Sequence, residues 1–325
     1  MAAHRNPKTW SQRLYIFFTG LCMGAADVVP GVSGGTMAFL MGVYEDLLDG
    51  IQSFNLGLLK KIFSRRFKEA FDQVPVQFLA LLVGGILFAF LSLVKVIKYL
   101  FEYQQALLFA FFFGLILASI VVLSRPVPWN ARRLLGLALG TAAGYLIVTL
   151  APHEMPKDPL TLLWCGAIAI MAMILPGISG SFVLLILGQY AWAIGQIDLA
   201  MSQLKAGEFA SVFQIGLKLA PLAFGAIAGL LAFARVLRWV LARWHWTTVA
   251  TLIGFMVGSL RKIWPWKETT KSIIVHDKER ILADRMVLPA PGAELWIAIG
   301  LALFGIALIA IMEILQGRKA KSAHA

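Results

Sequence analysis

Two stretches of the chain carry the same unusual pattern, and this pattern decides the fold. Residues 30–44 read PGVSGGTMAFLMGVY, and residues 176–190 read PGISGSFVLLILGQY. Self-similarity at a fixed distance along a chain indicates that one structural unit has been duplicated. At a shift of 146 residues, the identical positions are Pro30, Gly31, Ser33, Gly34, Gly42 and Tyr44 in the first stretch and Pro176, Gly177, Ser179, Gly180, Gly188 and Tyr190 in the second.

The duplication extends beyond these two motifs. At a shift of 140 residues, the matched positions are Gly85, Lys95, Val96, Lys98, Gly114 and Ser119 in the first half and Gly225, Arg235, Val236, Arg238, Gly254 and Ser259 in the second. The apolar run 132–151 then corresponds, more weakly, to the run 293–315. We therefore predict two repeats, residues 1–151 and 152–325, that together build one integral membrane domain.

The composition places the chain in a membrane. Of its 325 residues, 59% are hydrophobic and 14% are charged, whereas soluble domains are about 45–50% apolar and ~25% charged. This balance excludes an ordinary soluble globule, a disordered chain and a nucleic-acid-binding protein, so the net charge of +12 indicates membrane topology and contact with anionic lipids. Because Cys22 and Cys165 belong to no Cys-x-x-Cys or Cys/His cluster, we expect no metal site, disulfide or cofactor.

The apolar runs predict the membrane-spanning elements. A spanning helix needs about 20 mostly apolar residues, and such runs lie at residues 78–98, 105–123, 132–151, 213–234, 246–263 and 293–315. Two longer stretches, 14–44 and 161–194, are interrupted by Pro-Gly, and each would be roughly 45 Å long as a single helix, too long for an upright span. We predict an all-α polytopic membrane protein in which each repeat combines a Pro-Gly-broken re-entrant helical hairpin, near 14–50 or 161–194, with three transmembrane helices.

The basic residues predict the orientation, because Lys and Arg prefer cytoplasmic loops. If both broken stretches enter the membrane and return, 17 of the 29 basic residues lie on the cytoplasmic side and 11 outside; if each stretch crosses once, the numbers become 12 and 16. The re-entrant arrangement gives each repeat three crossings, so the second repeat is inverted relative to the first and both termini are cytoplasmic. The basic start of the chain mimics a signal peptide, but we expect no cleavage because the apolar run continues into the first motif.

Two connecting segments carry patterns of their own. Residues 55–72 predict an amphipathic surface helix, with apolar positions at Leu56, Leu59, Phe63, Phe67 and Phe71 and basic positions at Lys60, Lys61, Arg65, Arg66 and Lys68. Such a helix lies in the headgroup layer and attracts anionic lipids; the alternative is a solvated connector whose basic residues only set the topology. In the outer loop 264–292, weak alternation over 270–290 predicts a small hairpin.

The Pro-Gly motifs predict a polar cavity at membrane depth, since irregular backbone inside a bilayer is tolerated only where it is buried in protein or lines a wet cavity. Each proline, Pro30 or Pro176, ends an incoming half-helix. The glycine after it, Gly31 or Gly177, lets the backbone reverse, so the next half-helix directs its free N–H groups at the break. Brought together by symmetry, the two tips form a candidate phosphate site made of Ser33, Gly34, Gly35, Thr36, Ser179, Gly180 and Ser181. The alternative is that these small residues only allow helices to pack closely.

Asp27 is the sharpest single candidate. It lies within an apolar stretch, three residues before Pro30, and an acid at membrane depth is costly and is usually functional or paired. It could carry a coupling proton, or it could cap the first half-helix. Its repeat counterpart is Met173, so the two copies differ at this position.

The matched basic pairs are further phosphate-binding candidates. We expect Lys95 and Lys98 near one membrane face and Arg235 and Arg238 near the other, where they would guide a phosphate towards the tips. The alternative is that these side chains only reach from the ends of spans to the interface. The acidic residues at the end of the first hairpin are interpreted as solvated: Glu45, Asp46 and Asp49.

The run GAADVVPGVSGGT, residues 24–36, resembles the signature of the polyprenyl-phosphate transporter family, and LPGISGS, residues 175–181, resembles that family's second motif. The resemblance covers essentially the whole chain. It implies a translocase of the bacterial plasma (inner) membrane that returns undecaprenyl phosphate, a carrier lipid of envelope polysaccharides, from the outer to the cytoplasmic leaflet. It also implies coupling to an ion gradient, with H⁺ or Na⁺ as candidates. In the second motif Gly35-Thr36 becomes Ser181-Phe182, which argues against equal roles for the two tips.

Two other functions stay open at this stage. Membrane-embedded undecaprenyl-pyrophosphate phosphatases resemble the chain in their duplicated hairpins, but they carry an arginine directly after the tip serine and a glutamate-rich hairpin, whereas glycine follows Ser33 and Ser179 here. We therefore expect no catalytic residues. An ion-coupled carrier of a small soluble anion is the third reading, although the basic amphipathic segment and the long apolar walls favour a lipid. The sequence is compatible with an oligomer.

Overall fold

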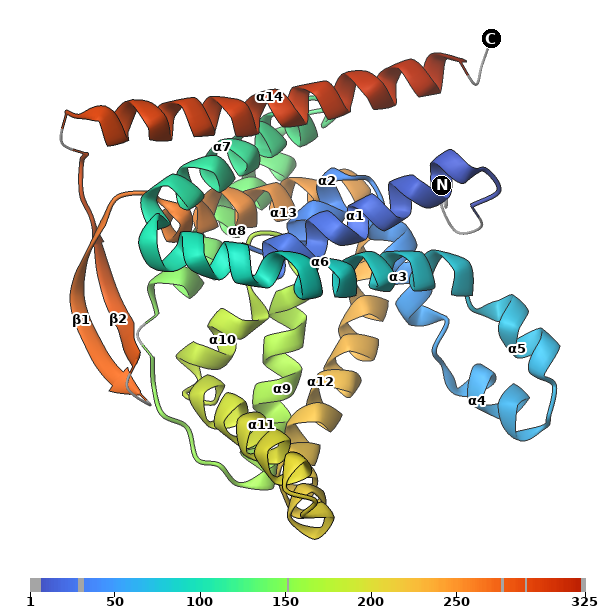
Figure 1. Cartoon of the computed structure of the whole chain (residues 1–325). Coiled ribbons are helices and arrows are strands. Elements are labelled where there is room, and N and C mark those ends of the chain that lie inside the picture. Colours follow the sequence, from blue (N-terminus) through green and yellow to red (C-terminus); the bar gives the residue numbers. More distant parts are fainter. Residues whose placement is uncertain (1–6, 29–31, 151, 276–277, 290, 323–325) are drawn as a thin grey trace.

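The structure is a computed structural model that describes residues 7–28, 32–150, 152–275, 278–289 and 291–322 (Figure 1). Within these residues the chain forms fourteen α-helices, one short 3-10 helix and one two-stranded sheet. Five of the helices are long and apolar enough to cross a membrane: α6, α7, α8, α12 and α14. The predicted class, an α-helical polytopic membrane protein, is confirmed.

The first repeat begins with the two helices that flank the first Pro-Gly break. Pro30 and Gly31 themselves lie outside the described residues. The last helix of the repeat starts where the Asn130 side chain accepts a hydrogen bond from the Arg133 amide, as an N-cap residue does. The helices are α1 (Trp10–Val28), α2 (Gly34–Leu40), α3 (Tyr44–Gln52), α4 (Leu56–Phe63), α5 (Phe67–Gln73), α6 (Val76–Tyr103), α7 (Gln105–Ser124) and α8 (Ala131–Thr149).

The second repeat opens in a similar way. At the start of the first helix, the Asp158 side chain accepts hydrogen bonds from the amides of Thr161 and Leu160. These hydrogen bonds, of which those from Thr161 have the largest effect, hold the pKa of Asp158 below its usual value. The elements are α9 (Pro159–Ile174), α10 (Gly180–Ile186), α11 (Tyr190–Lys205), α12 (Phe209–Arg243), α13 (His245–Ser259), the 3-10 helix η1 (Leu260–Ile263), β1 (Lys267–Val275), β2 (Lys278–Met286) and α14 (Ala293–Ser322).

Each broken stretch folds as three helices rather than as a simple two-armed hairpin. The short helix after the break ends two residues before a glycine in both repeats, and these glycines, Gly42 and Gly188, have φ of 68° and 69°. This left-handed backbone favours glycine and lets the chain turn sharply. In the second repeat the turn bends α11 away from α10 by 109°. The predicted hairpins near 14–50 and 161–194 therefore contain an additional corner, at a glycine that both motifs share.

The two repeats pack through equivalent contacts. Helix α1 lies against α6, and α9 lies against α12. At Gly20 the carbonyl oxygen of Leu82 occupies the place of a side chain, and at Gly166 the carbonyl oxygen of Leu222 does the same. Gly20 and Gly166 are 146 residues apart and Leu82 and Leu222 are 140 apart, the same shifts that the sequence shows.

The third span of each repeat packs on the other repeat. Helix α14 lies along α7, and α8 lies along α13; Figure 1 shows α14, in red, beside α7 at the top of the view. Gly114 on α7 meets the backbone of Ala302, and its counterpart Gly254 on α13 meets the backbone of Leu137. The repeats therefore share one core, centred on α7 and α13, while their inverted orientation in the membrane stays a prediction.

Three segments differ from the sequence-based expectation or refine it. The span expected at 246–263 is the 15-residue α13 followed by η1. At about 22 Å of α-helix, α13 is not among the helices long enough to cross a membrane by themselves. The prediction of a single surface helix over 55–72 is wrong, because α4 and α5 are separate helices. The connection between them contains Arg65, whose φ is 55°. The predicted hairpin near 270–290 is confirmed as the antiparallel pair β1–β2.

The apolar side chains of α4 and α5 remain uncovered. Leu56 and Phe63 are 83% and 85% exposed, and the other three predicted apolar positions are exposed as well. Asn55 caps α4 by accepting a hydrogen bond from the Leu58 amide, and Gln73 at the end of α5 donates to the same Asn55 side chain. This small unit therefore presents an apolar surface beside basic residues, the combination that favours a membrane interface.

Candidate functional site

The two tips contact each other at the centre of the molecule. We define the first tip as Val32–Thr36 and the second tip as Met173–Ser181. The Thr36 hydroxyl accepts a hydrogen bond from the Gly177 amide at 2.8 Å, and the Ser33 hydroxyl donates to the Met173 carbonyl at 3.4 Å. Tyr44, which follows the first tip, donates its hydroxyl to the Ile174 carbonyl at 2.9 Å. The symmetry of the sequence predicts this meeting of residues about 140 positions apart.

The contact between the tips is closed. Ser33 and Thr36 expose none of their surface, and Ser179 exposes 6%. Gly34, Gly35 and Gly180 are buried too, and a side chain at Gly35 would lie 2.8 Å from the Ile174 carbonyl oxygen. A ligand therefore reaches Ser33 and Thr36 only when the helices that carry the two tips move apart.

At the first tip, nearby side chains accept hydrogen bonds from the free amides at the start of α2. The Ser33 hydroxyl accepts a hydrogen bond from the Gly35 amide at 3.2 Å, so Ser33 is the N-cap of α2. Asp27 accepts a hydrogen bond from the Gly34 amide at 2.7 Å. A carboxylate at a helix N-terminus is favourable, because the free N–H groups carry partial positive charge. Asp27 therefore caps the start of α2, which is one of the two roles considered for this residue. Ion coupling by Asp27 stays a proposal.

The second tip lacks both of these caps. Ser179 makes no side-chain cap hydrogen bond to α10, and its hydroxyl lies 2.8 Å from the Ser181 hydroxyl instead. A side chain at Gly180 would meet the Cβ of Met173 at 2.9 Å, just as one at Gly34 would meet the Asp27 carboxylate at 2.5 Å. Met173 thus occupies the place of Asp27 but offers no acceptor. Within the part of the chain that the structure describes, no side chain caps the start of α10.

The predicted basic pairs lie on helices rather than at the tips. Lys95 and Lys98 belong to the C-terminal part of α6, and Arg235 and Arg238 to that of α12. Arg235 donates hydrogen bonds to the carbonyl oxygens of Leu231, at 2.8 Å, and Phe54, at 3.1 Å. It also lines a groove of about 750 Å³ between α4 and α12.

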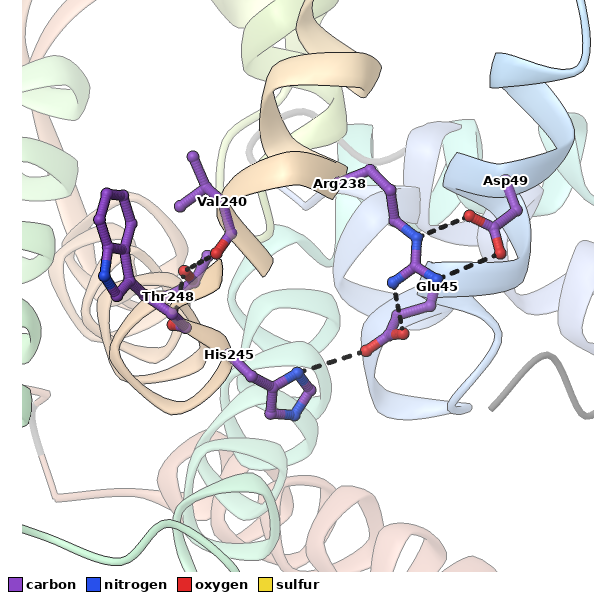
Figure 2. Close-up of polar contacts among 7 residues, drawn as sticks. Glu45, Asp49, Arg238, Val240, His245 and Thr248 are labelled. Atoms are coloured by element: carbon purple, nitrogen blue, oxygen red, sulfur yellow. Dashed lines mark hydrogen bonds and ion pairs between the residues drawn. The ribbon is translucent and has the colours of Figure 1, made fainter. Parts of the chain in front are cut away.

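Arg238 joins the two repeats through an ion-pair cluster (Figure 2). Figure 2 shows its guanidinium reaching from α12 towards Glu45 and Asp49 on α3. The Nε atom lies 2.7 Å from Asp49 Oδ1 and the Nη1 atom lies 2.9 Å from Glu45 Oε2. His245, at the start of α13, places Nδ1 3.6 Å from Glu45 Oε1. We call this arrangement the α3–α12 cluster.

The α3–α12 cluster corrects the interpretation of the acidic residues as solvated. Glu45 and Asp49 form ion pairs with Arg238, and Asp46 exposes only 4% of its surface. A sequence signal existed, since Glu45 and Asp49 are four residues apart and therefore share one face of a helix. Their repeat counterparts are Ala191 and Gly195, which carry no acid, so the cluster has no counterpart in the second hairpin.

A pocket of about 270 Å³ is lined in part by a residue of the second tip. Leu175, the residue before Pro176, forms part of its lining, and among the described residues Arg132 on α8 is the one charged residue that lines it. We call this cavity the α8–α13 pocket; its remaining lining residues are Leu237, Val240, Trp244, Thr247, Thr248, Thr251, Leu252 and Phe255. In the sequence, Arg132 is one of the basic residues of the connecting segments that predict the orientation. In the described residues no three His, Cys, Asp or Glu side chains gather in a way that would hold a metal ion.

The chain is similar to known proteins over most of its length. Residues 23–281 match the family described as undecaprenyl phosphate translocase-like. A polyprenyl-phosphate transporter of Vibrio cholerae serotype O1 is 40% identical over 278 residues, which cover 85% of this chain and 86% of that protein. A polyprenyl-phosphate transporter of Staphylococcus aureus is 33% identical over 261 residues, 76% of this chain and 84% of that protein. No solved structure matches the chain.

Proposed function

The chain belongs to the undecaprenyl phosphate translocase-like family, and from this membership we propose that it moves undecaprenyl phosphate from the outer to the cytoplasmic leaflet of the bacterial plasma membrane. The transported lipid would then be reused as a carrier for envelope polysaccharides. The proposed protein is a transporter rather than an enzyme, with both termini in the cytoplasm.

One observation carries this proposal: two hydroxyl-rich tips, one from each repeat, meet inside an otherwise apolar helical body. The phosphate headgroup cannot cross lipid unaided, because an unpaired charge in an apolar medium is very costly. Backbone amides and hydroxyls at the tips would replace its water when the tips separate. The proposed headgroup contacts are Ser33, Gly34, Gly35, Thr36, Ser179, Gly180 and Ser181, while the polyprenyl tail stays in the lipid.

Alternating access in this fold requires the repeats to move relative to each other. The α3–α12 cluster supports this mechanism because it ties α3 of the first repeat to α12 of the second through Arg238. An arginine fork pairs equally well with carboxylate and phosphate. We therefore assign Arg238 a closing role in the observed state, in addition to its proposed role as a phosphate contact. Lys95, Lys98 and Arg235 remain proposed guides for the headgroup at the ends of α6 and α12.

The ion gradient would act through Asp27. This carboxylate already contacts the Gly34 amide at the first tip, so a proton or Na⁺ bound there changes the charge that a phosphate meets. H⁺ or Na⁺ binding at Asp27 would offset part of the headgroup charge during transport.

The test is leaflet accessibility in vesicles that contain the purified protein and a labelled polyprenyl phosphate. A phosphatase that cannot cross the membrane is added outside. Protein-free vesicles should lose only the label in the outer leaflet, whereas vesicles with active protein should lose nearly all of it. A protein that binds the lipid yet leaves the inner-leaflet label protected would contradict the proposed function.

A parallel sample contains a polyprenyl pyrophosphate and no added phosphatase. Release of inorganic phosphate from this sample would identify the protein as a phosphatase. Uptake of soluble phosphate without any movement of lipid would identify it as a carrier of a small anion. The experiment therefore separates all three functions that the sequence leaves open.

A further inference from the structure

The α8–α13 pocket is lined both by a residue of the second tip and by residues that are exposed at the surface of the protein. Its walls are the start of α8, the C-terminal part of α12 and the first half of α13. Its lining includes Leu175, which directly precedes Pro176 of the second tip, and also the exposed residues Arg132 and Trp244. A ligand in this pocket is therefore next to the closed tips without having to open them.

Arg132 is presented in a way that suits a phosphate. Its guanidinium carbon lies 5.7 Å from the centre of the Trp244 ring, and Trp244 packs edge-on against Trp239 at 5.6 Å. Stacking on an aromatic face restrains the guanidinium while leaving its N–H donors, which lie in its own plane, available. Arg132 makes no ion pair with any residue that the structure describes. It therefore offers a bidentate site to an oxyanion.

The rest of the pocket suits an apolar chain. Leu237, Val240 and Phe255 contribute hydrocarbon to the lining. The hydroxyl of Thr248 donates to the Trp244 carbonyl at 2.9 Å, and that of Thr251 donates to the Thr247 carbonyl at 2.9 Å. Because these hydroxyl protons are engaged within α13, the walls offer few donors to a second anion. A ligand with one charged end and a hydrocarbon body fits this distribution.

The same location in the duplicated unit lacks this chemistry. At the shift of 140, Thr247, Thr248 and Thr251 correspond to Leu107, Leu108 and Phe111. At the shift of 165 that relates Gly140 to Gly305, Arg132 corresponds to Ile297. The arginine and the threonines are thus particular to one side of the molecule, and they do not follow from the repeated fold alone.

We propose that the α8–α13 pocket holds the polyprenyl phosphate next to the second tip, with the phosphomonoester on the exposed Arg132 and the first prenyl units between α12 and α13. A volume of about 270 Å³ equals roughly nine water molecules in the liquid, enough for a phosphate and a short hydrocarbon segment. This inference rests on the proposed function. It adds a second headgroup position outside the tips and names the residue that forms it.

The first experiment compares Arg132→Gln with Arg133→Gln. The two arginines are adjacent, but only Arg132 lines the pocket. Binding to the purified protein is measured by native mass spectrometry in mild detergent with polyprenyl phosphate, the prenol of equal length and phosphatidylglycerol. We expect Arg132→Gln to weaken binding of the polyprenyl phosphate about tenfold, with Arg133→Gln within about twofold of wild type and Arg132→Lys intermediate. Binding of the prenol should stay unchanged in all variants.

The second experiment fills the pocket from α12. Val240→Trp should weaken binding of both polyprenyl phosphate and prenol, because the hydrocarbon position is blocked. Val236→Trp is the matched control, since Val236 lies one turn earlier, is 54% exposed and does not line the pocket. Thermal unfolding of each variant reports whether it has folded.

The outcomes separate this inference from the proposed function. If wild type binds polyprenyl phosphate and Arg132→Gln equals Arg133→Gln, the pocket assignment is wrong and the translocase proposal stands. An equal loss for phosphatidylglycerol would also overturn the assignment, because it would show only general attraction of anionic lipid. If wild type binds no polyprenyl phosphate, the proposed function itself fails.

Discussion

The two tips share a sequence pattern and a backbone plan, yet they begin their helices differently. At the first tip, Asp27 and Ser33 accept the first amides of α2. At the second, Met173 stands in the place of Asp27, and Ser179 bonds to Ser181 rather than to the backbone of α10. The duplication has kept the geometry and changed the electrostatics. The Asp27 carboxylate offsets the partial positive charge at the start of α2, whereas the start of α10 has no side-chain partner among the described residues. Substitutions at equivalent positions should therefore have different effects.

The largest effect is expected from a substitution at Gly177, which disrupts the backbone of the second tip. Gly177 has φ of 91°, and a side chain there would lie 2.6 Å from the Ser259 hydroxyl and 3.0 Å from the Met256 backbone. Gly177→Ala should destabilise the protein by about 2 kcal/mol or more, measured as a fall in the thermal unfolding midpoint in detergent. Gly216→Ala on α12 is the control, since nothing lies within 4 Å of that position. Equal midpoints for the two variants would show that the second tip tolerates a side chain.

The next prediction uses the acids that only the first hairpin carries. Asp49→Cys with Arg238→Cys, in a chain whose native cysteines Cys22 and Cys165 are replaced by alanine, places two thiols across the α3–α12 cluster. A short bifunctional thiosulfonate reagent should link them and stop the transport that the unlinked double variant retains in the vesicle assay, and a reducing agent should restore that residual transport. Each single-cysteine variant serves as control. Full transport in the linked protein would show that α3 and α12 need not separate.

The third prediction makes the first tip electrically similar to the second. Asp27→Asn keeps an oxygen that can accept the hydrogen bond from the Gly34 amide but removes the charge. We expect transport to fall about tenfold or more and to lose its dependence on an imposed pH or Na⁺ gradient, with little change in the unfolding midpoint. Asp27→Met, the residue that the second tip carries at this place, should lower the midpoint as well. Normal gradient-driven transport by Asp27→Asn would leave Asp27 as a cap only.

The smallest expected effect compares the two serines. Ser33→Ala removes the N-cap hydrogen bond of α2 and should cost about 1 kcal/mol of stability. Ser179→Ala removes no cap bond and should cost less than about 0.5 kcal/mol. Chemical unfolding curves measure both. The double variant should in addition bind polyprenyl phosphate more weakly, and an unchanged lipid affinity would mean that the tips only pack helices.

The sequence predicted the features that depend on local pattern and on duplication. Matched positions such as Gly114 and Gly254 indicated the duplication, and the structure shows that both lie at helix contacts. The symmetry of the motifs predicted that Ser33 and Thr36 would meet the second tip. The corner at Gly42 was not predicted, although Gly42 is one of the identical positions, because the apolar run continues through it and a run alone does not show where the backbone turns.

Partners distant in the chain could not be read from local sequence. Arg238 and Asp49 are 189 residues apart, and their pairing depends on how α3 crosses α12. Likewise, the choice between Arg132 and Arg133 depends on the helical phase that the Asn130 cap sets at the start of α8. Composition placed both arginines in the same basic loop, and only the packed helices show which of them lines the pocket.

The third span of each repeat packs on the other repeat, and this arrangement has a consequence for how the protein is synthesised and assembled. Helix α7 is synthesised early, but its partner α14 is the last helix of the described chain. Until α14 has been synthesised, the face of α7 around Gly114 has lipid or the insertion machinery as its neighbour. Helix α8 likewise waits for α13. Assembly of this domain is therefore a late event in biogenesis, and a nascent chain halted before α14 leaves its central helix uncovered for membrane quality control to detect.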